Sequence, residues 1–292
     1  MSLTSSTSSQ NPLTADRLLA DATIEVIPLK GAGDQIQAAP ADATVAITCS
    51  PKFGLDRTVQ FCAVATGSGR RVVPHLAARM VPSRRALTDF VSQIQDLGIT
   101  DLYVIGGDGE RPAGPYSEAG QVLQDLQEHG HTLTRLGVGC YPEGHPLIDD
   151  DRLWVALERK QQLATYMVSQ MCFDAVAVRD WLARARQRGI SLPLRAGVAG
   201  PVKVAKLAEL SLRIGVGQSL RYLRKQHGMV GNVLRGRAYD PSPFVSAIAG
   251  TAGIEGLHIF SFNQVPEYVA WRDARRDSGD GRAAVGATQV PQ

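Results

Sequence analysis

Eight short apolar segments recur along the chain, and longer amphipathic segments separate them. Most are continuously apolar, as strands buried on both faces of a parallel sheet are. The segments are TIEVIP (23–28), TVAITCS (44–50), RVVPHL (71–76), DLYVIGG (101–107), RLGVGCY (135–141), YMVSQM (166–171), LPLRAGV (192–198) and LHIFSF (257–262). Eight strand–helix repeats in about 250 residues favour a single (β/α)8 TIM barrel over an open sheet.

The intervening segments carry helix start and stop signals. Residues 83–98 begin at Ser83 and end at Gly98, while 117–130 and 174–189 also end in glycine. A doubly wound sheet is the alternative fold, but no GxGxxG turn follows its first strand. The connection 200–256 is longer than one helix requires, so we expect extra helices between strands 7 and 8. The Pro241/Pro243 pair is expected to start the last of them.

Composition narrows both the organisation and the class of partner. We expect disordered tails at 1–16 and 278–292, where residues are polar or small, around one catalytic domain at 17–277. A net charge of +3 without a long basic run argues against nucleic acid and membrane surfaces. The absence of a long apolar stretch and of a signal sequence indicates a cytoplasmic protein, which we expect to be a monomer. Four cysteines without CxxC spacing indicate free thiols and no metal site.

Polar residues stand near the carboxyl ends of the expected strands, where a TIM barrel places its active site. They are Glu25, Thr48, His75, Asp108, Tyr141, Glu143, His145, Gln170, Asn263 and Gln264. Glu25 interrupts an apolar strand, where burial favours the protonated carboxyl and makes it a candidate proton donor. Each residue alone is also compatible with a structural role, and Glu143 and His145 with a solvated loop. Their convergence on one rim favours a polar ligand site.

Three longer motifs resemble segments of the methylenetetrahydrofolate reductase family. They are GGDGERPAGPYSEAGQVLQDL (106–126), VGCYPEGHP (138–146) and LERKQQLATYMVSQMCFD (157–174). TIEVIP and LHIFSFNQ occupy the places of the family's first and last strands, so the resemblance runs in consistent order over 23–264. It implies reduction of methylenetetrahydrofolate to methyltetrahydrofolate with a nicotinamide cofactor, in one-carbon metabolism and methionine biosynthesis.

The resemblance also implies roles for individual residues. Glu25 matches the family's general acid, Asp108 the aspartate that touches the pterin, and Gln170 the glutamine that hydrogen-bonds it. Thr48, Phe260 and Gln264 are further expected substrate contacts. The expected cofactor contacts are His75, Gly107, Tyr116, Tyr141, His145 and Lys160.

Departures from the family pattern fall mainly on the side where a flavin would lie. Gly106 replaces the arginine of an RGD motif, Arg152 replaces an aspartate, and Gln264 replaces a terminal arginine. We therefore expect NADH to pass hydride directly to the folate without FAD, and NADPH is disfavoured because no clamp for a 2′-phosphate is recognisable. The alternatives are an FAD-mediated ping-pong version of the same reaction, a non-catalytic folate-binding barrel, and a corrinoid or pterin methyltransferase.

Overall fold

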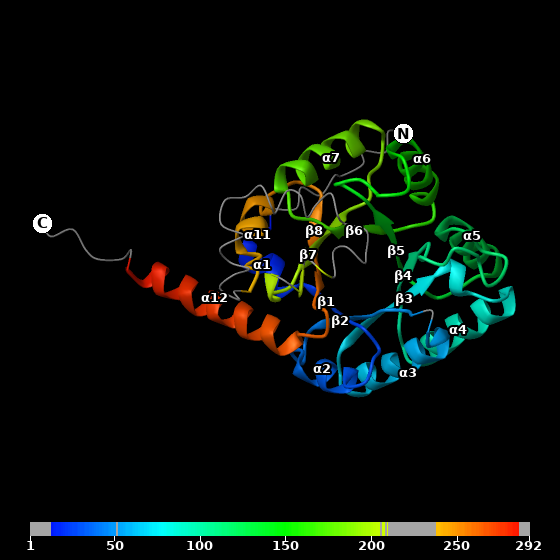
Figure 1. Cartoon of the computed structure of the whole chain (residues 1–292), viewed down its shortest axis with the longest axis horizontal. Coiled ribbons are helices and arrows are strands. Elements are labelled where there is room, and N and C mark those ends of the chain that lie inside the picture. The colour runs from blue at the N-terminus through cyan, green and yellow to red at the C-terminus, as the bar shows by residue number, and fades with distance from the viewer. Residues whose placement is uncertain (1–12, 51, 205, 208, 210–237, 286–292) are drawn as a thin grey trace, which may run out of the picture.

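The computed structural model describes residues 13–50, 52–204, 206, 207, 209 and 238–285, with side chains up to residue 275. Its centre is a closed barrel of eight parallel strands in sequential order (Figure 1). The strands are β1 Thr23–Val26, β2 Thr44–Ile47, β3 Arg71–Ala77, β4 Asp101–Ile105, β5 Arg135–Cys140, β6 Tyr166–Met171, β7 Leu194–Ala199 and β8 Ile254–Phe260. The predicted (β/α)8 TIM barrel is confirmed.

Helices surround the barrel and alternate with its strands (Figure 1). They are α1 Ala15–Ala20, α2 Ala32–Ala38, α3 Gly54–Gly67, the 3₁₀ turn η1 Ala78–Met80, α4 Arg84–Asp96, α5 Ala119–His129, α6 Asp150–Lys160, α7 Ala175–Gln187, α11 Ser242–Ile248 and α12 Val265–Val285. In the described part of the chain, no helix combines the length and apolarity needed to cross a membrane.

The helix α4 shows how local sequence sets these elements. Its N-cap is Ser83, whose hydroxyl accepts a hydrogen bond from the N–H of Ala86 and so satisfies one of the first free donors. Its buried side chains recur at helical spacing and face the barrel. They are Leu87, Phe90, Val91 and Ile94.

The strands bury side chains on both faces, which explains their continuous apolar character. Outward-pointing residues such as Ile24 and Val45 join the main core between the barrel and its helices. Inward-pointing residues form a separate cluster inside the barrel, made of Ala46, Val73, Tyr103, Tyr166 and Val168.

A charged network fills the amino-terminal end of the barrel. Glu255 accepts hydrogen bonds from Arg135 at 2.7 Å and from Arg195 at 2.9 Å. Asp101 accepts from the hydroxyl of Tyr166 at 2.7 Å and lies 3.4 Å from Arg135. Because these partly buried charges are paired with one another, this end of the barrel is filled by internal contacts. The opposite rim is left for a ligand site.

Several expected boundaries differ from the structure. Strand β1 ends at Val26 and β2 at Ile47, earlier than residues 28 and 50, because the apolar runs continue past the last ladder pairs. β8 begins at Ile254, three positions before its expected start at 257. The first helix starts at Ala15, inside the expected tail 1–16, and α12 continues past residue 277 to Val285.

The long connection between β7 and β8 is described only in part. It contains α11, which begins at Ser242 with Pro241 as its N-cap, where the proline pair predicted a helix start. The other extra helices expected between strands 7 and 8 fall largely on 210–237, outside the described residues.

Candidate active site

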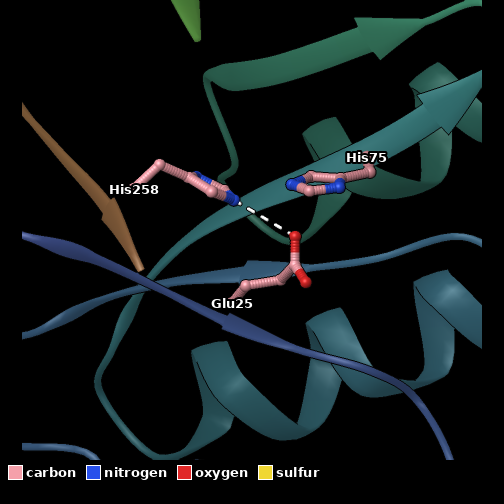
Figure 2. A group of neighbouring side chains, drawn as sticks. All are labelled: Glu25, His75 and His258. Carbon is pink, nitrogen blue, oxygen red and sulfur yellow. Dashed lines mark hydrogen bonds and ion pairs between the residues drawn. The ribbon is translucent and has the colours of Figure 1, made fainter. Parts of the chain in front are cut away.

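Glu25 lies inside the barrel near the carboxyl end of β1. Its neighbours Ile24 and Val26 point outward into the main core, so the alternation of the strand turns Glu25 inward. The residue is only 8% exposed. A carboxyl group at this depth needs a hydrogen-bonding partner, and two imidazoles point toward it (Figure 2).

The partner is His258 on β8, the strand that closes the barrel against β1. The Nε2 atom of His258 lies 3.2 Å from Oε2 of Glu25 (Figure 2), and His258 is 3% exposed. Sequence reasoning did not select His258, although LHIFSF offered a signal. A histidine between outward-facing Leu257 and Ile259 must point into the barrel.

The turn after β8 also holds the backbone around Glu25. The Ser261 hydroxyl donates to the carbonyl oxygen of Glu25. The side-chain amide of Asn263 accepts from the N–H of Ile27 at 2.8 Å and donates to its carbonyl oxygen at 2.9 Å. Phe262 and Asn263 have φ angles of 52° and 55°, and in the described residues they are the non-glycine positions with positive φ. Such strained backbone concentrates at functional sites.

His75 on β3 is the second imidazole. It is 4% exposed, and its Nε2 atom has no hydrogen-bond partner in the described structure. Its ring centroid lies 4.7 Å from that of Tyr103 and 5.5 Å from that of His258. Burial, and then the charge that His258 could carry, hold the pKa of His75 well below its ordinary value. His75 is therefore a neutral imidazole at neutral pH.

Among the described residues, Glu25, His75 and His258 also form a group of side chains that could hold a metal ion. One atom from each lies within 4.8 Å of the others. A tetrahedral Zn²⁺ with bonds of about 2.0–2.1 Å holds its donors about 3.3 Å apart. Glu25 and His258 meet that spacing through their own contact at 3.2 Å, whereas the full trio is wider. The geometry fits a hydrogen-bonded pair beside a neutral imidazole better than a preformed metal centre.

A second group of predicted residues lies at the mouth of the barrel. Asp108 is exposed in the loop after β4 and acts electrostatically on Cys49, Tyr141 and His145. The rings of Tyr141 and His145 meet edge to face with centroids 5.0 Å apart. Burial lowers the pKa of His145, and Asp108 opposes that shift.

Gly107 shapes the same loop. Its φ of 89° is one that side chains rarely adopt, and a Cβ there would lie 3.0 Å from Cβ of Ala77. A glycine at this position lets the backbone of the β4 loop approach β3.

The expected substrate contacts sit at the ends of their strands. Phe260 packs edge to face on His258, with centroids 5.2 Å apart. The side-chain oxygen of Gln170 accepts from the N–H of Met171 at 2.8 Å. Thr48 follows β2, and its N–H donates to the carbonyl of Val26 at 3.1 Å. The N–H of Gln264 donates to the carbonyl of Ser261 at 2.9 Å.

Two expected cofactor contacts are engaged in internal hydrogen bonds. The hydroxyl of Tyr116 donates to the buried carboxylate of Asp125 on α5 at 2.6 Å. Lys160 donates to the carbonyl of Gly139 at 3.2 Å, and burial lowers its pKa. These two contacts, and Gly106 in place of an arginine, are the features of this wall that bear on a flavin.

Glu143 in the YPEGHP loop has a structural role. The sequence allowed either a place in the ligand site or a solvated loop position for it. One carboxylate oxygen of Glu143 accepts from the N–H of Phe173 at 2.6 Å and from that of Asp174 at 2.7 Å. Asp174 in turn caps α7 by accepting from the N–H groups of Val176 and Ala177. Glu143 thus links the loop after β5 to the start of α7. Its carboxylate is bonded to backbone N–H groups and is not simply solvated, as the loop interpretation allowed.

Comparison with known families agrees with these observations. The family described as Methylenetetrahydrofolate reductase matches residues 45–218, more than half of the chain of 292 residues. The match includes His75, Asp108 and Gln170, whereas Glu25 and β8 lie outside it. The chain therefore belongs to the methylenetetrahydrofolate reductase family of oxidoreductases, an assignment that implies a folate as its small-molecule substrate.

Proposed function

We propose that this enzyme reduces 5,10-methylenetetrahydrofolate to 5-methyltetrahydrofolate by direct hydride transfer from NADH, with Glu25 as the general acid. The observation that carries the proposal is the buried carboxyl of Glu25 inside the barrel, in contact with His258. A cytoplasmic monomer that serves one-carbon metabolism and methionine biosynthesis is part of the same proposal.

The proposed reaction balances with one proton and one hydride. Glu25 gives its proton to N10 of the folate, the bond between N10 and the methylene carbon breaks, and that carbon becomes an iminium bonded to N5. NADH supplies the hydride that converts the iminium carbon to a methyl group, and NAD⁺ leaves. A proton from solvent restores Glu25. General acid catalysis of this kind contributes about 10²–10⁴ in rate.

Direct transfer is supported by what the expected flavin contacts do instead. The hydroxyl proton of Tyr116 goes to Asp125 and Lys160 donates to the carbonyl of Gly139, so part of the hydrogen-bonding capacity of both residues is used within the protein. The residues proposed to face nicotinamide and substrate stand on the strands near their carboxyl ends or in the loops that follow them. They are His75, Gly107, Tyr141 and His145 on the nicotinamide side, and Asp108, Gln170, Thr48, Phe260 and Gln264 on the folate side. NADH is preferred to NADPH because none of them is a cation suited to a 2′-phosphate.

The test is steady-state kinetics on protein freed of any flavin. NADH oxidation is followed with methylenetetrahydrofolate, with both concentrations varied. Direct transfer in a ternary complex predicts intersecting double-reciprocal lines and no stimulation by added FAD. Parallel lines with a requirement for FAD would establish the flavin-mediated alternative. Folate binding without NADH oxidation would identify a non-catalytic binding barrel.

The role of Glu25 is tested by Glu25→Gln, which keeps the shape and removes the transferable proton. We expect kcat to fall by about 10²–10⁴, while the surface change Glu128→Gln on α5 leaves it unchanged. Full activity in Glu25→Gln would remove the residue from the mechanism.

A further inference from the structure

We propose that the end of β8 and the turn after it act as a positioning unit for Glu25, with His258 as its central residue. The unit consists of His258, Ser261 and Asn263. This inference rests on the proposed function, because it assigns these residues a role through the proton donor. None of them is proposed to touch the reacting atoms.

His258 fixes the carboxyl group. With a proton on Nε2 it donates to Oε2 of Glu25 across 3.2 Å, and within the described residues the Glu25 carboxyl has no other hydrogen-bond partner. Both side chains are buried, so water competes little for this bond, and hydrogen bonds are stronger in such surroundings. The bond occupies one carboxyl oxygen and leaves the other to carry the proton that the substrate receives.

Ser261 and Asn263 fix the backbone that carries the carboxyl group. Ser261 holds the carbonyl of Glu25 itself, and Asn263 holds both polar groups of Ile27, two residues further along. The positive φ angles at Phe262 and Asn263 allow the chain to turn back so that both side chains reach β1. Strand β1 and β8 share only two ladder pairs, Thr23 with His258 and Ile24 with Ile259, so these side chains replace the missing ladder beyond Ile24.

His75 supports the same arrangement without bonding to Glu25. Its low pKa keeps it neutral, and its unpaired Nε2 lies next to the pair. A cation at the position of His75 would compete for the Glu25 carboxylate, and a neutral ring does not.

The test compares two substitutions of His258 that differ only in the ability to donate. His258→Gln can place an amide N–H near the position of Nε2, whereas His258→Leu cannot. We expect His258→Leu to lower kcat about 10²-fold, the usual cost of a misplaced reacting group. The KM for the folate should change less than threefold, and His258→Gln should recover at least tenfold of the lost kcat. His129→Gln on the exposed end of α5 is the matched control. Equal losses in both variants, or a raised KM at constant kcat, would overturn the proposal.

A measurement that needs no activity keeps the inference separate from the proposed reaction. Nitrogen-15 NMR of the histidine rings should show His258 protonated at Nε2, and its signals should shift in Glu25→Gln. If His258 is protonated at Nδ1 and its nitrogen-15 signals do not change in Glu25→Gln, the pairing is refuted even if the enzyme is active. A protein with the expected NMR signals and no folate reductase activity would refute the proposed function alone. Activity lost to a chelator and restored by Zn²⁺ would replace the hydrogen-bonded pair by a metal site.

Discussion

The bond pattern of Asn263 allows a quantitative prediction for Asn263→Ala. The substitution removes two hydrogen bonds, one with the backbone N–H of Ile27 at 2.8 Å and one with its carbonyl oxygen at 2.9 Å, both partly buried. Each such bond contributes about 1 kcal/mol net, and a buried backbone group left without a partner costs about 1–3 kcal/mol. Alanine also tolerates the φ of 55° less well than asparagine, which adds about 1 kcal/mol. Because part of the freed peptide can hydrate, we expect a total loss of about 2–4 kcal/mol in the free energy of unfolding.

Urea unfolding, followed by circular dichroism, measures this loss through the transition midpoint at unchanged slope. Asn263→Gly should recover part of it, because glycine accepts positive φ without strain. Gln264→Ala, on the same turn, is the matched control. A loss below about 0.5 kcal/mol in Asn263→Ala, within the range of ordinary surface substitutions, would show that the turn does not hold β1.

Three further predictions concern pH, thiol reactivity and loop attachment. Folding lowers the pKa of His75, so below about pH 6.5 this imidazole binds a proton in the unfolded chain but not in the folded chain. Stability should therefore fall with decreasing pH by up to about 1.4 kcal/mol per pH unit from this group. His75→Gln should flatten the dependence of the melting temperature on pH between about 7 and about 5. Burial raises the pKa of Cys49 to about 12, and the other three thiols are also raised. Iodoacetamide at about pH 8, below the ordinary thiol pKa, should leave the native protein unmodified in mass spectrometry while labelling all four cysteines in urea; rapid labelling of the native protein would contradict this. Glu143→Ala removes two short bonds to the N–H groups of Phe173 and Asp174 and should cost about 3 kcal/mol or more, whereas unchanged urea unfolding would mean that the loop is held otherwise.

The fold could be predicted because its signals are local. Continuous apolar runs indicate strands buried on both faces, and glycines after amphipathic segments indicate helix ends. Strand ends were less accurate because hydrophobicity does not reveal where ladder bonds stop. At Ile27 the chain is still apolar, but its peptide groups bond to the side chain of Asn263 instead of a neighbouring strand.

Sequence can single out a residue that carries its own signal, but it does not reveal which residues barrel closure brings together. Glu25 is conspicuous because it is a charge in an apolar strand. Its partner His258 is 233 positions away, and only closure of the barrel brings the two together. The cofactor contacts of Tyr116 and Lys160 stay predictions, and their residue types alone could not reveal that the fold also gives them Asp125 and the carbonyl of Gly139 as partners.

The most direct measurement of the proposed chemistry is the fate of the transferred hydrogen. Flavin-free enzyme would be incubated with methylenetetrahydrofolate and NADH deuterated at C4, with each of the two stereoisomers in turn, and the product methyl group would be examined by mass spectrometry. Direct transfer predicts one deuterium in the methyl group of 5-methyltetrahydrofolate from one stereoisomer, with none lost to water. A methyl group whose new hydrogen comes from solvent, or a product that forms only when FAD is added, would contradict direct transfer.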